Sequence, residues 1–381
     1  MAWSFEWLRT WDAVWEPGHV ARWRALCEAP DTHATPFVHP ELIAGWLAAM
    51  GGRGAFAPFF LQARHSGGQE VLWPLVRPRP GWRRGLLRRM VPAGDGPGGP
   101  YFSYSDPLVA PAASPERVFA EGFWPAFERE IRSHCGTWLD SCTIHRLRPA
   151  CLGEVPGQPV SPGSTYVRLD AYPDFDAYAA ARPPAMASQV RRRLRRLEAE
   201  GRVALHVLGP GERDAALAWI PRLAAGQRAR YPGSELPQPF FESIVTAGFD
   251  SGLVRCSTLT IDGVPVSWRV DYLLGGTLSL AACTFDEGFA KHSPGQLHTW
   301  LLLRWHMQRG GTVYDPLIGQ QAYKYEWTDG AEHHLRRIVF ESAAPATRVR
   351  RQAGRGLAGI QRLGDRAVAA VTAKGRRWIG T

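Results

Sequence analysis

The sequence predicts an α+β fold in which mixed, mainly antiparallel sheets are flanked by helices. Two-residue turns, Asp262-Gly263 and Gly275-Gly276, separate three apolar runs between residues 252 and 285. Such turns are the strongest short-range signal of β-hairpins, so we expect a three-stranded antiparallel meander here. One helix and two strands are predicted after it, at 294–310, 312–316 and 335–340. This order of elements indicates an α+β fold and not a doubly wound sheet.

The N-terminal half has a related order of elements. Two apolar runs on either side of Gly67-Gly68 predict a strand, a turn and a strand. A helix is marked by Ser114 as its cap, Pro115 as its first residue and Gly136 after its end. A strand over 137–149 follows it. Because both halves hold a strand–turn–strand followed by a helix and a strand, we expect a structural duplication.

The length of the chain, 381 residues, indicates about two domains. Residues 149–165 are rich in Pro, Gly and Ser and lack a periodic pattern, which is typical of a linker. We therefore predict an N-terminal domain, a linker, a C-terminal domain and a basic helical tail, at 1–150, 151–165, 166–345 and 346–381.

The chain carries a formal net charge of +10, and its 45 basic residues include only three lysines, Lys291, Lys324 and Lys374. A basic protein suits an anionic partner such as a nucleic acid, a phosphate-bearing cofactor or a lipid surface. The charge does not choose among these partners.

The cysteines and the hydropathy predict a reduced, cytoplasmic protein. None of the six cysteines forms a CxxC pair, and Cys135, Cys142 and Cys151 are spaced too widely for a zinc site. We therefore expect no metal. The N-terminus does not resemble a signal peptide, and no apolar window is long enough for a membrane-spanning helix.

The start of the predicted helix at 294–310 allows two interpretations. Ser293, Pro294 and Gln296 match a capping box with proline at the first helical position, which would stabilise the helix by roughly 1 kcal/mol. Alternatively, the free N–H groups of Gly295 and Gln296 bind a pyrophosphate at the positive end of the helix dipole. The residue types alone favour the first interpretation and leave the second open.

The segment after this helix holds two candidate catalytic residues. Asp315 precedes a proline, which places it at the end of a strand, although it could equally be a turn residue. Lys324 lies between Tyr323 and Tyr325, close to Trp327. A lysine on the surface is the usual case, but an amine among aromatic rings can be desolvated and can hold a carboxylate, phosphate or thioester oxygen.

The ordered set "DG", "FD…F…SPG" and "YK..WT" within residues 262–329 resembles the FemAB/BioF2-like branch of the GNAT acyltransferase superfamily. The resemblance runs in order over residues 36–341, and the members related to cellulose- and exopolysaccharide-associated acetyltransferases look most similar. It implies tandem GNAT-like domains and transfer of an acyl group from acetyl-CoA or another acyl-CoA. The acceptor would be an amine or hydroxyl of a small molecule or of a saccharide precursor of the cell envelope.

The resemblance implies that Lys324 and Tyr323 belong to the site, and for this chemistry we expect roles for further residues. Asp315 or Asp286 would accept a proton, and Lys324 and Tyr323 would hold the substrate or polarise the carbonyl. The pyrophosphate would lie near Ser293, Gly295 and Gln296. Trp327 and either Arg269 or Asp271 would line the substrate side, since we expect the last two to point to opposite faces of a strand. The usual GNAT signature Q/R-x-x-G-x-G/A is absent, and only "KHSPGQ" stands in its place.

Two other functions remain open at this point. One is a FemAB-type peptidyltransferase that uses aminoacyl-tRNA, although no heptad run for a coiled-coil arm is visible. The other is a degenerate GNAT scaffold that binds RNA or membrane. A basic helix over 184–200 and the tail at 346–381 are expected to pack on the body, but they could instead hold anions or touch a lipid surface. We do not expect nucleic acid as the main partner, and the oligomeric state is open.

Overall fold

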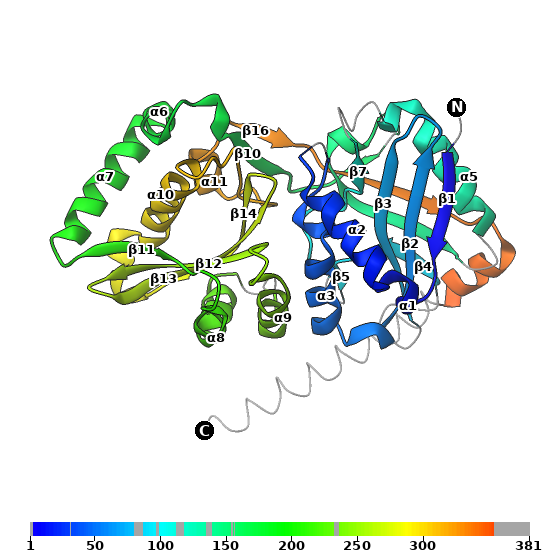
Figure 1. The fold of residues 1–381 in the computed structure, drawn as a ribbon, viewed down its shortest axis with the longest axis horizontal. Helices are drawn as coiled ribbons and strands as arrows, with labels where there is room; N and C mark the ends of the chain where they lie inside the picture. Colours follow the sequence, from blue (N-terminus) through cyan, green and yellow to red (C-terminus); the bar gives the residue numbers. More distant parts are fainter. Residues whose placement is uncertain are drawn as a thin grey trace, which may run out of the picture.

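The computed structural model describes residues 3–353, apart from 31, 80–86, 97–98, 112–117, 135–138, 154, 156 and 232–235. We call the part up to residue 150 the N-terminal half and the part from residue 166 the C-terminal half. Each half is built around one large sheet, and the two halves lie side by side (Figure 1).

The N-terminal sheet has the strand order β1-β2-β3-β4-β8-β17-β9, and β7 also pairs with β3. Its strands are β1 (Trp3–Leu8), β2 (Phe56–His65), β3 (Glu70–Pro78), β4 (Arg89–Pro92), β7 (Leu108–Ala110), β8 (Ser141–Leu147), β9 (Gln158–Pro159) and β17 (Arg336–Glu341). A separate small hairpin is formed by β5 (Asp95–Gly96) and β6 (Gly99–Pro100).

The C-terminal sheet has the strand order β11-β12-β13-β14-β15-β10-β16. Its strands are β10 (Ser164–Arg168), β11 (Val203–Val207), β12 (Val254–Ile261), β13 (Val264–Leu274), β14 (Thr277–Phe285), β15 (Val313–Asp315) and β16 (Ala331–His333). The predicted meander is therefore confirmed as β12, β13 and β14, joined at the two predicted turns.

The two sheets repeat one topology. Strands β1 to β4 pair antiparallel in order, and β8 then joins β4 in parallel after helix α5. Strands β11 to β14 do the same, and β15 joins β14 in parallel after helix α10. The structural duplication expected from the sequence is thus confirmed at the level of strand order and direction.

The described helices cover the faces of these sheets. They are α1 (Trp11–Val14), α2 (Pro17–Glu28), α3 (Pro40–Ala49), α5 (Trp124–His134), α6 (Phe175–Ala181), α7 (Pro184–Glu198), α8 (Arg213–Arg230), α9 (Gln238–Gly248), α10 (Pro294–Met307) and α11 (Ala322–Glu326). A π-helical turn, Phe119–Phe123, leads into α5, while the predicted cap Ser114, Pro115 and Gly136 lie outside the described residues. None of the helices within the described ranges is both long and apolar enough to cross a bilayer.

The largest apolar core lies between the halves. It joins side chains of α2 and α3, such as Trp23 and Trp46, to side chains of α9, such as Phe240 and Ile244. At Gly45 of α3, an added Cβ would lie 2.9 Å from the backbone of Ile244, so the two helices pack with almost no space between them. This close packing fixes how the halves face each other.

A two-stranded ribbon also connects the sheets. Strands β9 and β10 run along one side of it, and β16 and β17 run along the other (Figure 1). Ser164 lies opposite His333 in the C-terminal sheet, and Pro159 lies opposite Arg336 in the N-terminal sheet. The segment that we predicted to be a linker therefore contributes strands, and β17 completes the N-terminal sheet from the far end of the chain. The domain limits themselves remain a prediction.

The two basic helices pack as the simpler interpretation expected, where they are described. On α7, Val190 and Leu197 are buried and Leu194 is half-buried. Residues 345–353 are helical, and Thr347 and Arg350 bind the Asp140 carboxylate of the N-terminal half at 2.7 Å and 2.5 Å. The tail beyond residue 353 lies outside the described residues.

Candidate functional site

The C-terminal sheet opens between β14 and β15. These parallel strands pair only from Thr277 to Ser279 and from Val313 to Asp315. Beyond that point β14 continues to Phe285, whereas the chain after Asp315 turns away. The pairing of β13 with β14 also skips Ala281, which is a β-bulge. Two cavities lie at this opening.

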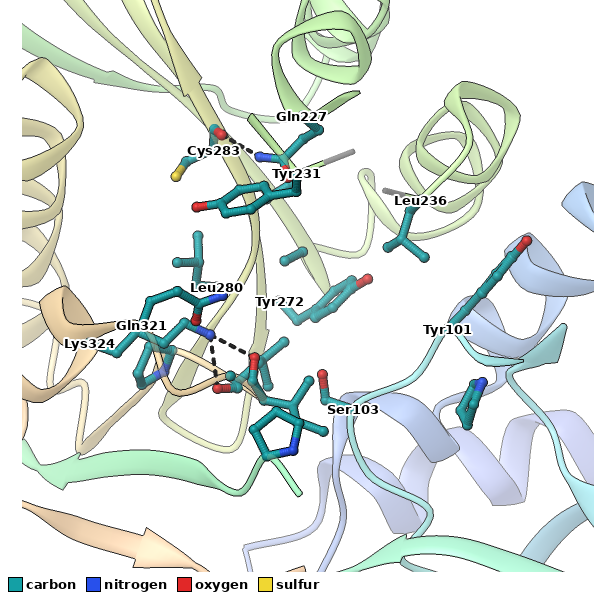
Figure 2. A pocket seen from close by; sticks show the side chains of 18 of the residues that line it. Tyr101, Ser103, Gln227, Tyr231, Leu236, Tyr272, Leu280, Cys283, Gln321 and Lys324 are labelled. Atoms are coloured by element: carbon teal, nitrogen blue, oxygen red, sulfur yellow. Dashed lines mark hydrogen bonds between the residues drawn. The ribbon is translucent and has the colours of Figure 1, made fainter. Parts of the chain in front are cut away.

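The first cavity, here the inter-half cavity, has a volume of about 350 Å³. Tyr101 and Ser103 reach it from the N-terminal half, while its other walls belong mainly to the C-terminal half (Figure 2). The residues that line it and matter below are Tyr101, Ser103, Arg146, Gln227, Tyr231, Tyr272, Cys283, Leu317, Gln321, Tyr323 and Lys324.

The second cavity, here the α10 cavity, has a volume of about 300 Å³ and lies at the N-terminus of α10. Ser293, Gly295, Gln296 and Trp327 line it, as does Arg230. Four residues line both cavities: Tyr231, Leu280, Cys283 and Tyr323. The two cavities therefore share a wall, and a molecule in one would face a molecule in the other across it.

Strained backbone marks the same region. Of the described non-glycine residues, four have positive φ, and three of them line these cavities: Arg146 at 51°, Ser293 at 50° and Leu317 at 58°. The fourth, Asp262, lies in a hairpin turn. Such conformations cost on the order of 1–3 kcal/mol each and gather at functional sites.

Lys324 is a buried lysine in the wall of the inter-half cavity, with only 5% of its surface exposed. Its Nζ donates hydrogen bonds to the carbonyl oxygens of Leu317 at 3.1 Å and Ile318 at 2.7 Å (Figure 2). Burial lowers the pKa of Lys324 to about 8, although the nearby Asp315 carboxylate acts in the opposite direction. The amine is thus a cation at neutral pH that can lose its proton at mildly alkaline pH.

Asp315 ends β15 but does not line either cavity. Tyr104 of the N-terminal half donates to its carboxylate at 2.8 Å, and the Leu317 N–H donates at 2.8 Å. Tyr104 Oη also lies 2.7 Å from the Ser164 hydroxyl. Burial raises the pKa of Asp315, and these hydrogen bonds act against the rise. The strand-end position predicted for Asp315 is confirmed, while a role as proton acceptor stays a prediction.

Tyr323 lies in the wall between the cavities and forms a hydrogen bond with Tyr231. Burial raises the pKa of Tyr323, so its hydroxyl stays protonated at neutral pH. A protonated phenol at this wall can donate a hydrogen bond to an oxygen that gains negative charge.

The capping box predicted at Ser293 is wrong. Ser293 is the N-cap residue of α10, but its left-handed backbone keeps its side chain from capping the helix. The Gln296 side chain instead accepts from Arg193 of α7, and the Gln296 N–H donates to the Ser293 carbonyl at 2.9 Å. The Gly295 N–H has no partner among the described residues. Only one of the two expected free donors is therefore present.

Asp286 does not reach either cavity. Its carboxylate accepts from the Gly288 N–H at 2.9 Å, which caps a short 3₁₀ helix, and it binds Arg222 at 2.5 Å on the surface. This arrangement gives Asp286 a structural role, and the geometry does not support it as a proton acceptor.

Arg269 and Asp271 were expected to point to opposite faces, and this prediction is wrong. Residues two apart on a strand point to the same face. Arg269 Nη2 binds Asp271 Oδ1 at 2.7 Å, and both side chains are 1% exposed. Arg269 also donates to Thr299 Oγ1 at 2.8 Å. The pair lies behind the α10 cavity and is satisfied within the protein, so neither residue is placed to bind a substrate.

Several residues of the site were not found from the sequence. Tyr104 and Arg146 come from the N-terminal half, Tyr231 follows α8, and Cys283 lies on β14. No local pattern marks them, because their position depends on how the halves pack. Tyr101 and Tyr104 follow a glycine-rich stretch at 94–99, and this is the signal in the sequence that could have pointed to them.

A group with metal-ligand chemistry, although no metal was expected, lies in the N-terminal half. His33, Asp106 and Cys151 bring their ligand atoms within 4.8 Å of one another. Arg148 already binds Asp106, and its guanidinium also lies 3.1 Å from His33 Nε2. A cation in this position competes with a metal ion for the same atoms.

The comparisons with known proteins agree with this geometry. Residues 185–325 match an acetyltransferase (GNAT) domain. This segment runs from α7 to α11 and contains Lys324, the opening between β14 and β15, and most residues of both cavities. None of the curated proteins compared with the chain is significantly similar to it in sequence.

Two solved structures share the fold over most of the chain. A crystal structure of FemX has a TM-score of 0.57 at 11% identity, covering 83% of this chain and 98% of that one. The C-terminal domain of a putative lysylphosphatidylglycerol synthetase from Agrobacterium fabrum has a TM-score of 0.50 at 10% identity, covering 88% and 95%. The chain thus has a mixed α+β, GNAT-type acyltransferase fold, as expected from the sequence. At these identities the likeness concerns the fold alone.

Proposed function

We propose that this protein transfers an acyl group from an acyl-CoA to an amine or hydroxyl, with the donor in the α10 cavity and the acceptor in the inter-half cavity. The observation that carries the proposal is the shared wall of the two cavities at the opening between β14 and β15. Cavities that share lining residues are adjacent, so reactants bound in them would be held close together, which lowers the barrier of a direct transfer.

The α10 cavity fits the pyrophosphate and thioester end of such a donor. The Gly295 N–H is unpaired among the described residues and points from the positive end of α10. An added Cβ at Gly295 would meet no atom closer than Phe285 at 3.6 Å, so the space beside it is open. Arg230 lines this cavity, and Arg193 lies beside it at Gln296. These residues supply the positive charge that phosphate groups require.

The chemistry is a nucleophilic attack on the thioester carbonyl. The acceptor forms a new C–N or C–O bond, the C–S bond breaks, and the CoA thiolate leaves and takes up a proton. Lys324 or the Tyr323 hydroxyl would stabilise the negative oxygen of the tetrahedral intermediate. The proton that the acceptor loses passes to solvent or to a base, for which Asp315 is the buried candidate behind Lys324. We further propose that the acceptor is a small molecule or a saccharide precursor, as the sequence resemblance implies.

The test is calorimetric binding of acetyl-CoA and of desulfo-CoA, followed by thiol release with an acceptor panel and with Lys324→Ala. We expect micromolar binding of both CoA species by both proteins, and loss of turnover in the variant alone. If no CoA species binds even at millimolar concentration, the acyl-CoA donor is wrong. Aminoacyl-tRNA would then become the donor to test.

A further inference from the structure

We propose that the inter-half cavity selects an acidic acceptor, whose carboxylate or phosphate oxygens bind the guanidinium of Arg146. This inference rests on the proposed function in so far as the bound molecule is the acceptor. The binding site itself follows from the charges and contacts of the cavity. Arg146 itself lies outside the acetyltransferase match, which begins at residue 185.

The charged residues in the described lining of the inter-half cavity are all cationic. Of the described residues that line it, two are cationic, Arg146 and Lys324, and none is acidic. The remaining polar groups are mostly hydroxyls and amides, which donate hydrogen bonds without carrying charge. Asp315 lies behind Lys324, and its carboxylate is already bound by Tyr104 and the Leu317 N–H. Asp95 acts electrostatically on Arg146 from outside the lining, so a bound anion would be the only negative charge inside the cavity itself.

A β-bulge and a strained backbone place Arg146 at the cavity. It lies in a β-bulge of β8, where the pairing with β17 passes from Leu147 opposite Arg336 to Ile144 opposite Ile338. Its backbone is left-handed, with φ at 51°. A bulge redirects a side chain that would otherwise follow the strand, here towards the inter-half cavity. Backbone strain of this kind persists only where the surrounding structure enforces it, and strained residues gather at functional sites.

The guanidinium of Arg146 has N–H donors that are not used within the described part of the protein. Nη1 donates to the carbonyl oxygens of Phe102 at 2.9 Å and Pro100 at 3.2 Å, which fixes the side chain against the N-terminal half. Nη2 and Nε of Arg146 form no hydrogen bond with the described residues. A guanidinium anchored at one nitrogen can present the others as a planar fork, which matches the two oxygens of a carboxylate or phosphate.

Cys283 offers a chemical reporter for this charge, because the residue lines the inter-half cavity and is partly exposed, whereas the other described cysteines are buried. The cations that act on its thiol are Arg269, Arg230 and Lys324, so Arg146 is expected to act on the incoming reagent and not on the thiol. Iodoacetate and iodoacetamide have the same size and attack the same thiolate, but only iodoacetate carries a carboxylate. A thiolate in water repels iodoacetate and reacts faster with iodoacetamide. A cationic cavity reverses this preference. The ratio of the two rates does not depend on the thiolate fraction, since both reagents use the same thiolate.

The experiment measures the two alkylation rates at Cys283 by peptide mass spectrometry near neutral pH, without any acyl donor. We expect wild type to react faster with iodoacetate, and Arg146→Gln to lose roughly tenfold of that preference. Arg146→Lys keeps the charge and should retain most of the preference, and it also covers the case in which Arg146→Gln folds poorly. Arg64→Gln removes an exposed arginine from β2, outside the cavity, and should change nothing.

Alkylation in the presence of acetate or of inorganic phosphate distinguishes the chemical source of the anion. Acetate or inorganic phosphate, whichever binds, should slow the reaction of Cys283 with iodoacetamide in wild type but not in Arg146→Gln. Equal or faster labelling by iodoacetamide in wild type would overturn the proposal. So would a failure of iodoacetate to label Cys283, because the cavity would then be closed to a small anion. Since no donor is present, a positive result stands even if CoA binding fails, and the reverse also holds.

Discussion

Tyr104 of the N-terminal half donates a hydrogen bond to Asp315 of the C-terminal half at 2.8 Å, and both side chains are buried from solvent. The two residues are 211 positions apart in the sequence. This bond connects the end of β15, which precedes helix α11 and its Lys324, to the other half of the molecule. The geometry of the candidate site therefore depends on both halves.

Replacing Tyr104 by phenylalanine should destabilise the protein by about 1–3 kcal/mol, because it leaves a buried carboxylate with one donor fewer. The loss of unfolding free energy in this variant should become larger as pH rises. The folded pKa of Asp315 is raised already and would rise further, so the folded state holds its proton longer than the unfolded state, and stability falls as pH rises through this window. Urea unfolding at acidic and neutral pH measures the effect.

The matched control is Tyr166→Phe, since the Tyr166 hydroxyl forms no hydrogen bond with the described residues and the ring stacks on His333. This control should cost little at either pH. An equal loss in both variants would contradict a specific role for the bond between Tyr104 and Asp315.

Lys324 should make the protein more stable at alkaline pH. Its pKa is about 8 when folded against 10.5 in the unfolded chain, so between these values the unfolded state binds more protons and unfolding becomes less favourable as pH rises. A Lys324→Met variant lacks this gain, and its stability relative to wild type should fall by up to about 3 kcal/mol across the window. Urea unfolding from pH 7 to 10.5 tests this, with the exposed lysine variant Lys291→Met as control. Parallel curves for wild type and Lys324→Met would contradict the lowered pKa.

Gly295→Ala should fold normally and bind acetyl-CoA roughly tenfold more weakly, because the methyl group would displace a phosphate from the Gly295 N–H. The fold tolerates the change, since the new Cβ would meet Phe285 only at 3.6 Å. Gly54→Ala is the control, at a glycine that has open space around it and lines neither cavity. Calorimetry gives the dissociation constants, and unchanged binding by Gly295→Ala would place the donor phosphates elsewhere.

The buried pair of Arg269 and Asp271 should be important for stability and not for substrate binding. Arg269→Met leaves an unpaired buried carboxylate and should cost about 3–5 kcal/mol. Arg168 and Asp170 form an exposed pair with the same spacing, so Arg168→Met should cost less than about 1 kcal/mol. Denaturant unfolding compares the two variants directly. If both variants lost a similar amount of unfolding free energy, burial would not determine how much each ion pair contributes to stability.

Local patterns predicted the elements better than the site. The turns at Asp262-Gly263 and Gly275-Gly276 specify their hairpins within a few residues, and Pro294 sets the start of α10. The cap at Ser293 failed, because a left-handed backbone at that position overrode the side-chain preference.

The site itself depends on contacts that no local pattern contains. Lys324 could be singled out because lysine is rare in this chain and this one lies among aromatic residues. Tyr104 and Arg146 could not, since their neighbours in space are set by the packing of α3 against α9 and by the bulge in β8. The error over Arg269 and Asp271 came from applying the strand period wrongly, not from a missing signal.

The ribbon of β9, β10, β16 and β17 has a consequence for biosynthesis. During translation, the N-terminal half emerges from the ribosome long before β17 (Arg336–Glu341), the strand that pairs with β8, is made. Until then, the edge of β8 and its backbone donors have no partner from β17. The N-terminal sheet can therefore be completed only after the C-terminal half and β17 have emerged, so the C-terminal half is made before its neighbour's fold is finished.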